Sequence, residues 1–295
     1  MPIKSLYSEV KNATMINLDP KIYLDSNISL PLSKIEVIER DPNSPAFVFH
    51  SPELPSPFIK NNYSLEWFQQ LNLETFYKNT NRNWVHLHTG NDKELFINLE
   101  YLKAVQLTKK VKGFVMELRI QQGWLSVHSN NRTHLYNAFL YLRHRFSVND
   151  PLHLGQDDAS ILVIRRKFVE AVRFNNDINL ATIMTTEKDS IDIEYSQRTP
   201  IKKDMTFLER DQSYYSACGA GPLWYFLHIS AIAQVYRTHH SSVSIEVVTT
   251  SKNRIPVLLT PFTVDAALAY LQRHSRAPSR TLSPDGNKRP RNETP

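Results

Sequence analysis

The sequence predicts an α+β protein made of about four tandem small modules, each an antiparallel β-sheet of three to four strands followed by a helix. Three observations lead to this prediction: an apolar spine that recurs along the chain, two β-rich runs after each spine, and a stretch of helical spacing after the runs. Repetition at a fixed period is typical of chains built from similar units.

The spine consists of apolar residues at relative positions 1, 3, 6 and 9. Its four copies end 67, 67 and 63 residues apart. In the third copy Arg166 stands where an apolar residue is expected, so it stays open whether this copy is a true repeat. The copies occupy residues 30–38, 97–105, 164–172 and 227–235.

Two short runs follow each spine, and their β-rich composition between polar turns predicts strands. The first runs are 46–50, 114–120, 178–184 and 243–248, and the second runs are 58–59, 124–127, 191–195 and 255–259. Apolar residues at i, i+3, i+4 and i+7 then predict a helix in each copy. The expected helix starts are Ser64, Thr133, Asp204 and either Pro261 or Thr263.

These elements predict a division into an N-terminal segment, four modules and a tail. A module of about 65 residues buries only a small core, so we expect the modules to pack on one another. The alternative is a coincidence of ordinary α+β domains. The predicted parts are 1–21, module 1 at 22–83, module 2 at 84–152, module 3 at 153–220, module 4 at 221–275 and a disordered basic tail at 276–295.

Composition is that of an ordinary globular chain, with 41% apolar and 22% charged residues among 295. No apolar run is long enough for a membrane helix. Cys218 is the one cysteine, which excludes an internal disulfide and favours a reducing intracellular compartment. We therefore expect an intracellular protein, with a nuclear location open if the host is eukaryotic.

The formal net charge of +6 is concentrated near the C-terminus. Six basic residues against two acidic ones follow residue 272, which leaves the rest of the chain close to neutral. The tail is rich in Pro, Ser and Arg and is expected to be disordered. A short cluster in it matches a nuclear targeting signal and consists of Lys288, Arg289, Pro290 and Arg291.

Motifs of catalysis are scarce in this chain. It has seven glycines and no glycine-rich phosphate loop, so neither a cofactor nor a catalytic residue is predicted. Cys218 followed by His228 is the closest approach to a nucleophile and base, and an incidental thiol is the simpler interpretation. His86 and His88 would project to one side of a strand, as two metal ligands do. Because no third ligand is identifiable, no metal site is predicted.

A nucleic-acid interface is the alternative that the sequence leaves open. Trp84, Trp124 and Trp224 fall in expected strands, where exposed rings flanked by cations would stack on the bases of a single strand. The candidate cations for this interpretation are Lys109, Lys110, Lys112, Arg165, Arg166 and Lys167.

The function that we expect is that of a non-enzymatic intracellular adaptor or assembly protein. Tandem sheets offer continuous surfaces and edge strands to a protein partner, which is the partner we expect first. Nucleic acid is the second, and no small-molecule ligand is indicated. Convergence of the candidate cations on one face beside exposed aromatic rings would favour nucleic acid, whereas scattered cations would favour the adaptor.

Overall fold

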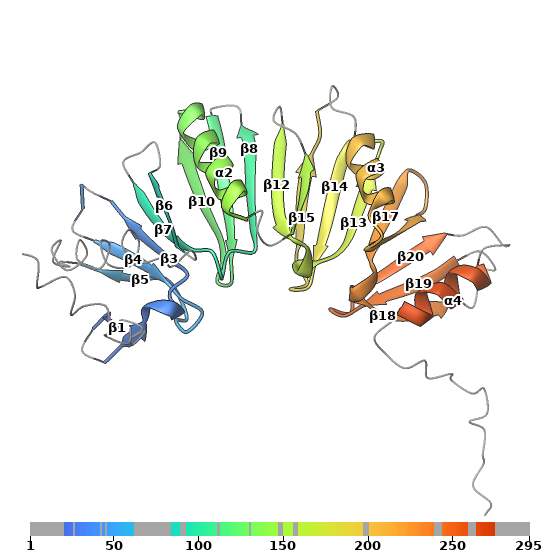
Figure 1. The fold of residues 1–295 in the computed structure, drawn as a ribbon, viewed down its shortest axis with the longest axis horizontal. Coiled ribbons are helices and arrows are strands. Elements are labelled where there is room, and N and C mark those ends of the chain that lie inside the picture. The colour runs from blue at the N-terminus through green and yellow to red at the C-terminus, as the bar shows by residue number, and fades with distance from the viewer. Residues whose placement is uncertain are drawn as a thin grey trace, which may run out of the picture. The chain divides into compact units, whose positions relative to one another are not determined.

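The computed structural model describes residues 21–25, 27–41, 43–44, 46–61, 84–88, 93–110, 113–129, 131–146, 150–155, 159–196, 201–238, 244–258 and 264–274. The chain divides into two compact units, Met1–Asp150 and Pro151–Pro295. In Figure 1 unit 1 runs from blue to green and unit 2 from yellow-green to red.

Unit 1 is built mainly of antiparallel strands. A two-stranded ribbon of β1 (Lys21–Tyr23) and β2 (Ser29–Pro31) comes first. A five-stranded sheet follows in the order β5–β4–β3–β7–β6, with β3 (Val37–Arg40), β4 (Phe47–His50), β5 (Phe58–Lys60), β6 (Trp84–His88) and β7 (Glu94–Asn98). The meander that closes the unit consists of β8 (Ala104–Lys110), β9 (Gly113–Ile120) and β10 (Gly123–Ser129).

Unit 2 contains a hairpin and a larger antiparallel sheet. The hairpin is formed by β11 (Pro151–Gly155) and β12 (Ser160–Arg165). The eight-stranded sheet has the order β15–β14–β13–β17–β16–β20–β19–β18. Its strands are β13 (Val169–Asn175), β14 (Leu180–Thr185), β15 (Ser190–Glu194), β16 (Tyr214–Cys218), β17 (Leu223–His228), β18 (Ile232–Arg237), β19 (Ser244–Thr249) and β20 (Arg254–Leu258).

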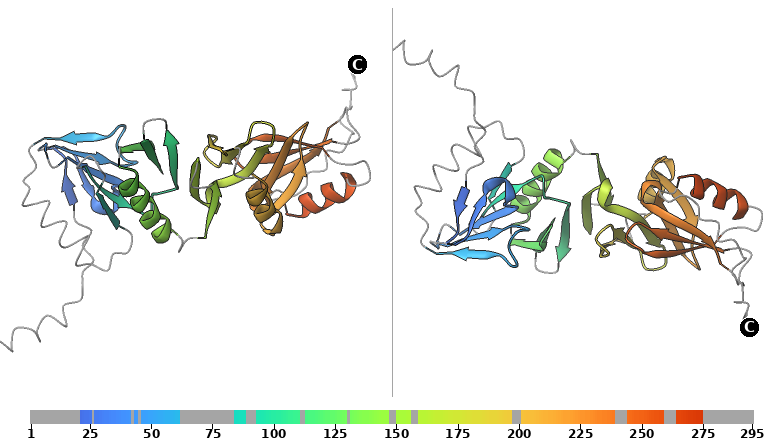
Figure 2. Two further views of the ribbon diagram at one scale, coloured as in Figure 1. Left: turned by 90° about the horizontal axis from the view of Figure 1, so that it is seen from above. Right: turned by 90° about the horizontal axis from the view of Figure 1, so that it is seen from below.

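Three α-helices lie in the described residues: α2 (Arg132–Phe146), α3 (Lys202–Arg210) and α4 (Val264–His274). In α2 the residues Leu135, Phe139, Leu142 and Phe146 are fully buried and form one stripe, which packs on β8, β9 and β10. Burial of each such side chain contributes roughly 1.5–3 kcal/mol. In unit 2, α3 packs on β16 and α4 on β18 and β19, and both helices lie on the same side of the strands (Figure 2).

Two predicted helix starts differ from the observed ones. Helix α2 begins before Thr133, because the side chain of Asn131 accepts a hydrogen bond of 3.2 Å from the His134 amide and thereby caps the helix. Asp204 lies within α3 rather than ahead of it, and its carboxylate accepts bonds from the Gly155 amide and the Tyr195 hydroxyl, both at 2.7 Å. Ser64, Pro261 and Thr263 lie outside the described residues.

The predicted α+β class of tandem sheet-plus-helix modules is wrong, because the protein is mostly β. Strands from successive predicted modules pair with one another: β3 pairs with β7, and β13 pairs with β17. Period-2 alternation identifies a strand but not its neighbour. Pairing of the edge strands of two small sheets satisfies backbone groups that would otherwise stay unpaired. The bounds of the four modules stay a prediction.

Each predicted spine proves to be a corner between two strands. A 3₁₀ turn forms the corner in three of them: η2 (Leu32–Lys34), η5 (Arg166–Phe168) and η6 (Ile229–Ala231). The residue that follows each turn donates a backbone hydrogen bond to the carbonyl of the first residue of the turn, as Ile35 does to Leu32 at 3.0 Å. The spacing of 1, 3, 6 and 9 therefore reflects two strands joined by a three-residue turn.

A buried glutamate follows the first corner of each unit. Glu36 in unit 1 accepts backbone bonds from Gln121 at 3.1 Å and Gln122 at 3.4 Å, in the turn between β9 and β10. Glu170 in unit 2 lies at the corresponding position and accepts five bonds of 2.6–2.9 Å from the turn between β19 and β20. Its donors are Thr249, Thr250, Ser251 and Asn253. In both units one carboxylate thus ties the first corner to the last hairpin.

We expect Glu170→Ala to lower the free energy of unfolding by roughly 3 kcal/mol or more, because several buried donors lose their acceptor at once. Urea denaturation of the full chain measures the change. The matched control is Glu194→Ala, an exposed residue of β15, which should alter stability by no more than about 0.5 kcal/mol. Equal urea midpoints for the two variants would contradict the assigned role.

Glu36 should make stability depend on pH in a defined direction. Burial raises the pKa of Glu36 above 4.5 against the opposing effect of its backbone hydrogen bonds. A carboxyl whose pKa is higher in the folded state than in the unfolded state contributes stability at pH values below its unfolded-state pKa. This contribution is lost as the pH rises through its folded-state pKa. We therefore expect Glu36→Gln to cost more stability at about pH 4 than at about pH 7, measured as the difference between variant and wild type at each pH. The opposite order would contradict the assignment.

Candidate functional site

The six predicted nucleic-acid cations fall in different settings. Lys109 and Lys110 are exposed at the end of β8 in unit 1, and Lys112 lies outside the described residues. Arg165 is buried, whereas Lys167 is exposed in η5 with its ammonium group 5.1 Å from the Phe168 ring. The cations at 109–110 and at 165–167 belong to different units.

Arg166 has a structural role that accounts for its place in the third spine. Its guanidinium forms an ion pair with Asp211, at the end of α3, and lies over the rings of Phe207 and Tyr214. Burial opposes ionisation of Asp211, but hydrogen bonds from Ser213 and Arg166 outweigh it, so the pKa of this carboxyl lies below its usual value. An arginine engaged in this way ties η5 to α3 rather than presenting its charge to a ligand.

The tryptophans do not form a stacking platform in the described sheets. Trp84 is buried, and Trp224 is half-buried in the eight-stranded sheet. Trp124 is 37% exposed, and the Arg119 guanidinium lies over its ring at 5.5 Å. Stacking of successive bases requires accessible ring faces, so the sheet surfaces offer little to the bases of a single strand.

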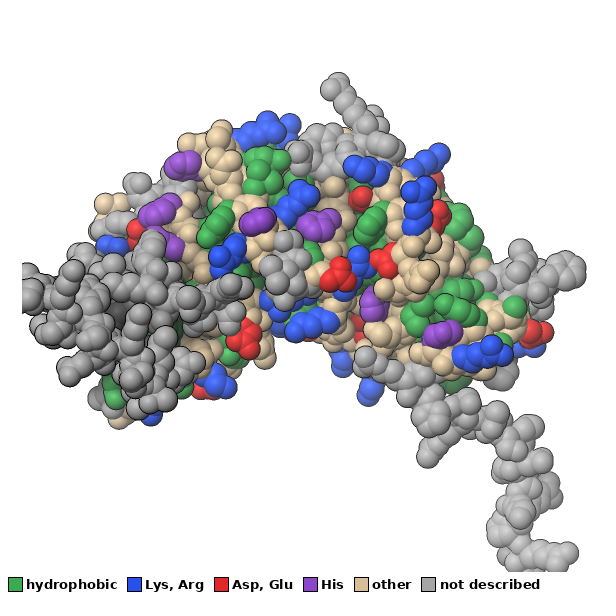
Figure 3. Space-filling view, in the orientation of Figure 1, with side chains coloured by type: hydrophobic (Ala, Val, Ile, Leu, Met, Phe, Trp, Pro, Cys, Tyr) green, Lys and Arg blue, Asp and Glu red, His purple; other side chains and the backbone are tan. Residues whose placement is uncertain are grey.

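Helix α2 presents a surface that the sequence prediction did not single out. The helix contains no acidic residue, and its exposed side carries Arg132, His134, Arg143 and His144. No carboxylate occurs between Glu117 and Asp150 in the sequence, a signal that could have revealed this surface in advance. Figure 3 shows basic and histidine side chains over the helix. We call the surface formed by Lys109, Arg132 and Arg143 the α2 face.

Phe114 organises the cations at the start of the α2 face. It is paired with Lys109 across β8 and β9, and the Arg132 guanidinium lies over its ring at 5.0 Å. Arg143 lies eleven residues further along the helix, which is three turns and about 16 Å. Arg132 and Arg143 therefore share one flank of the helix, beside the stripe that packs on the sheet.

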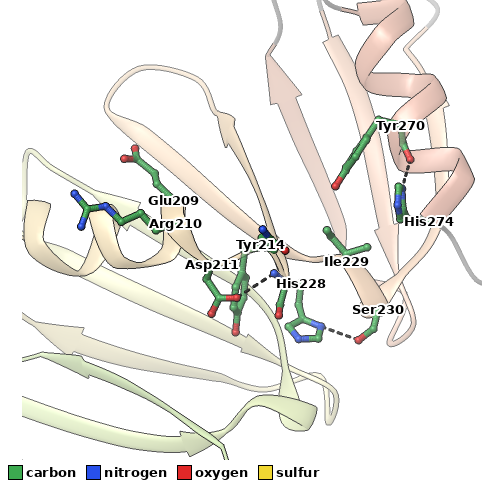
Figure 4. Close-up of a pocket in the computed structure, with 11 residues that line it drawn as sticks. Glu209, Arg210, Asp211, Tyr214, His228, Ile229, Ser230, Tyr270 and His274 are labelled. Atoms are coloured by element: carbon green, nitrogen blue, oxygen red, sulfur yellow. Dashed lines mark hydrogen bonds between the residues drawn. The ribbon is translucent and has the colours of Figure 1, made fainter.

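Unit 2 contains a hollow of about 740 Å³ between the ends of α3 and α4 (Figure 4). Two of its histidines are engaged locally: His228 Nδ1 lies 2.7 Å from the Ser230 hydroxyl, and His274 Nδ1 donates to the Tyr270 carbonyl at 2.7 Å. Asp211 is held by Arg166. No acid and base are paired for proton transfer among the described residues that line it.

Cys218 is exposed in β16 but does not form a nucleophile and base with His228. Across β16 and β17 His228 is opposite Tyr214, whereas Cys218 is opposite Trp224. These two cross-strand pairs lie four residues apart along the strands, which is about 13 Å. The thiol is therefore out of reach of the imidazole.

His86 and His88 lie side by side on β6, with ring centroids 4.3 Å apart. The Glu94 carboxylate on β7 faces both of them, and no two ligand atoms of the three side chains are more than 4.8 Å apart. Burial and the neighbouring His88 lower the pKa of His86 to about 4. The sequence prediction missed Glu94 because its position opposite His88 depends on the pairing of β6 with β7.

The predicted targeting cluster of Lys288, Arg289, Pro290 and Arg291 lies outside the described residues. Within the part of the chain that the structure describes, no helix has the length and apolar character needed to cross a membrane. No family model matches the chain, and neither a curated protein nor a solved structure matches it.

Proposed function

We propose that this protein is a non-enzymatic nucleic-acid-binding protein whose α2 face, which includes only Lys109 of the six cations predicted from the sequence, contacts phosphate groups. The observation that carries the proposal is a 15-residue helix with an exposed cationic side and no carboxylate. Phosphate contacts from Arg and Lys supply most of the affinity in sequence-independent binding.

The helix dipole accounts for only some of these charges. Basic residues in the last turn, such as Arg143, are favoured near the negative end of the dipole and are common in helices without a ligand. Arg132 stands at the positive end, where an acidic residue would be favoured instead. A cation at that end adds to the local positive potential, which suits an anionic partner.

The mode of binding that we propose is contact with the backbone rather than with bases. The Arg132 guanidinium is held in place by its contact with the Phe114 ring. A cation fixed in this way can make a phosphate contact that sets the position of the nucleic acid. Because the described tryptophans are buried, half-buried or covered by an arginine, base stacking contributes little. Binding should consequently be steeply salt-dependent and tolerant of sequence.

The double variant Arg132→Gln/Arg143→Gln tests the proposal. Loss of two phosphate contacts should weaken binding to duplex DNA and lower the slope of log affinity against log salt by about 2. Fluorescence anisotropy over a salt series measures both quantities for the full chain, with duplex and single-stranded oligonucleotides of equal length. Wild type and variant carry the same tail, so their difference reports on α2.

The control for that experiment removes the same charge elsewhere. Lys188→Gln/Lys252→Gln changes two exposed lysines in tight turns of unit 2 and should leave the slope unchanged. Equal losses in the two double variants would show that only net charge matters and would overturn the assignment to α2.

A second candidate function, the adaptor, is supported by the edge of the eight-stranded sheet. Among the described strands β18 is outermost in that sheet, so one of its sides is open to an added strand. Tyr236 on this strand is 43% exposed and offers apolar surface to a partner. An extended peptide can bind to such an edge by continuing the ladder of hydrogen bonds.

For the adaptor, we expect Tyr236→Lys to abolish capture of a protein partner that wild type retains, because a lysine on an edge strand opposes pairing. The measurement is affinity capture followed by hydrogen exchange of the β18 amides, which the partner should protect. The control Ile178→Lys changes an exposed residue in a turn and should bind as wild type does. A partner that leaves β18 exchange unchanged would exclude this edge.

A further inference from the structure

We propose that His86, His88 and Glu94 form a zinc site at the edge of the five-stranded sheet in unit 1. The two histidines come from β6, and Glu94 comes from the neighbouring strand β7. Two imidazoles and a carboxylate are a ligand set that zinc takes in proteins, usually with a water in the fourth position. This inference is independent of the proposed nucleic-acid binding.

Strand geometry brings the three side chains to one face. His86 and His88 are two residues apart on a strand and therefore project to the same side. Glu94 is directly opposite His88 in the antiparallel register. Adjacent and facing positions of a two-stranded ladder bring side chains within reach of a common ion.

The distances fit an ion better than they fit hydrogen bonds. Glu94 Oε1 lies 3.9 Å from His86 Nε2 and 3.6 Å from His88 Nδ1. Both separations are too long for hydrogen bonds. Ligands at 2.0–2.1 Å from a tetrahedral zinc ion lie about 3.3 Å from one another, so small side-chain movements would complete the site.

Neighbouring residues orient two of the ligands. Arg40 Nη1 donates to Glu94 Oε2 at 2.9 Å, which leaves Oε1 directed toward the histidines. The His86 ring stacks on Phe96, with centroids 4.2 Å apart and planes 8° apart. Partners that fix the orientation of ligands in this way raise metal affinity, and losing them typically costs 10–100-fold.

The nature of the donors selects the metal. Calcium and magnesium prefer sites made of oxygen ligands alone, so two nitrogen donors disfavour them. Imidazole suits zinc and other first-row divalent ions. The side chains of His86 and Glu94 are 13% and 14% exposed and that of His88 is 67% exposed, so an ion would reach the site on the side of His88.

Titration of the metal-free full chain with Zn²⁺ against a chromogenic chelator tests the inference. We expect one tightly bound equivalent in wild type and an affinity at least about 100-fold weaker in His88→Ala, which loses a direct ligand. The side chain of His88 is mostly exposed, so its removal should preserve the fold, and circular dichroism verifies this. Zinc should also raise the melting temperature of wild type but not of His88→Ala.

The control is His128→Ala, which removes an exposed histidine from β10 and should bind zinc as wild type does. Addition of Co²⁺ to wild type should produce visible absorption bands that His88→Ala lacks. Absence of a bound equivalent in wild type, or equal zinc affinity in wild type and His88→Ala, would overturn the proposal. Intact nucleic-acid binding by His88→Ala would separate the zinc site from the α2 face.

Discussion

The fold of each unit depends on a buried carboxylate that accepts hydrogen bonds from the turn of a distant hairpin. Glu36 and Glu170 stand directly after strand corners and accept hydrogen bonds from residues about 80 positions further along the chain. A carboxylate without water is tolerated only when donors satisfy it, so its burial and the closure of the hairpin onto the corner are mutually dependent. In unit 1, none of the described strands β1–β7 pairs with β8, β9 or β10, so strand pairing does not supply this link.

This closure also determines what each unit can present to a partner. In unit 1 the hairpin held by Glu36 consists of β9 and β10, and its strands form the surface on which α2 packs. Because the apolar stripe of α2 is buried there, the cations on its other sides are turned outward. The binding surface that we propose is thus a consequence of how the hairpin is anchored.

Sequence patterns predicted the strands well and their partners poorly. The runs at 46–50, 114–120, 178–184 and 191–195 each overlap an observed strand, because alternation and turn residues act locally. The spine at 164–172 predicts an apolar repeat with one departure at Arg166, and in the structure it is a corner at which Arg166 is held by Asp211, 45 residues away. An ion pair across such a separation leaves no periodic trace in the sequence.

The sequence by itself determined where strands and α2 form, the low net charge of the chain outside its tail, and the cationic character of α2. Tertiary structure alone decided which strands are neighbours, that Arg165 and Arg166 are withdrawn into the fold, and that Glu94 faces His86 and His88. The physical reason is that propensity and alternation depend on adjacent residues, whereas strand pairing, burial of charge and a shared ligand set depend on contacts between distant ones.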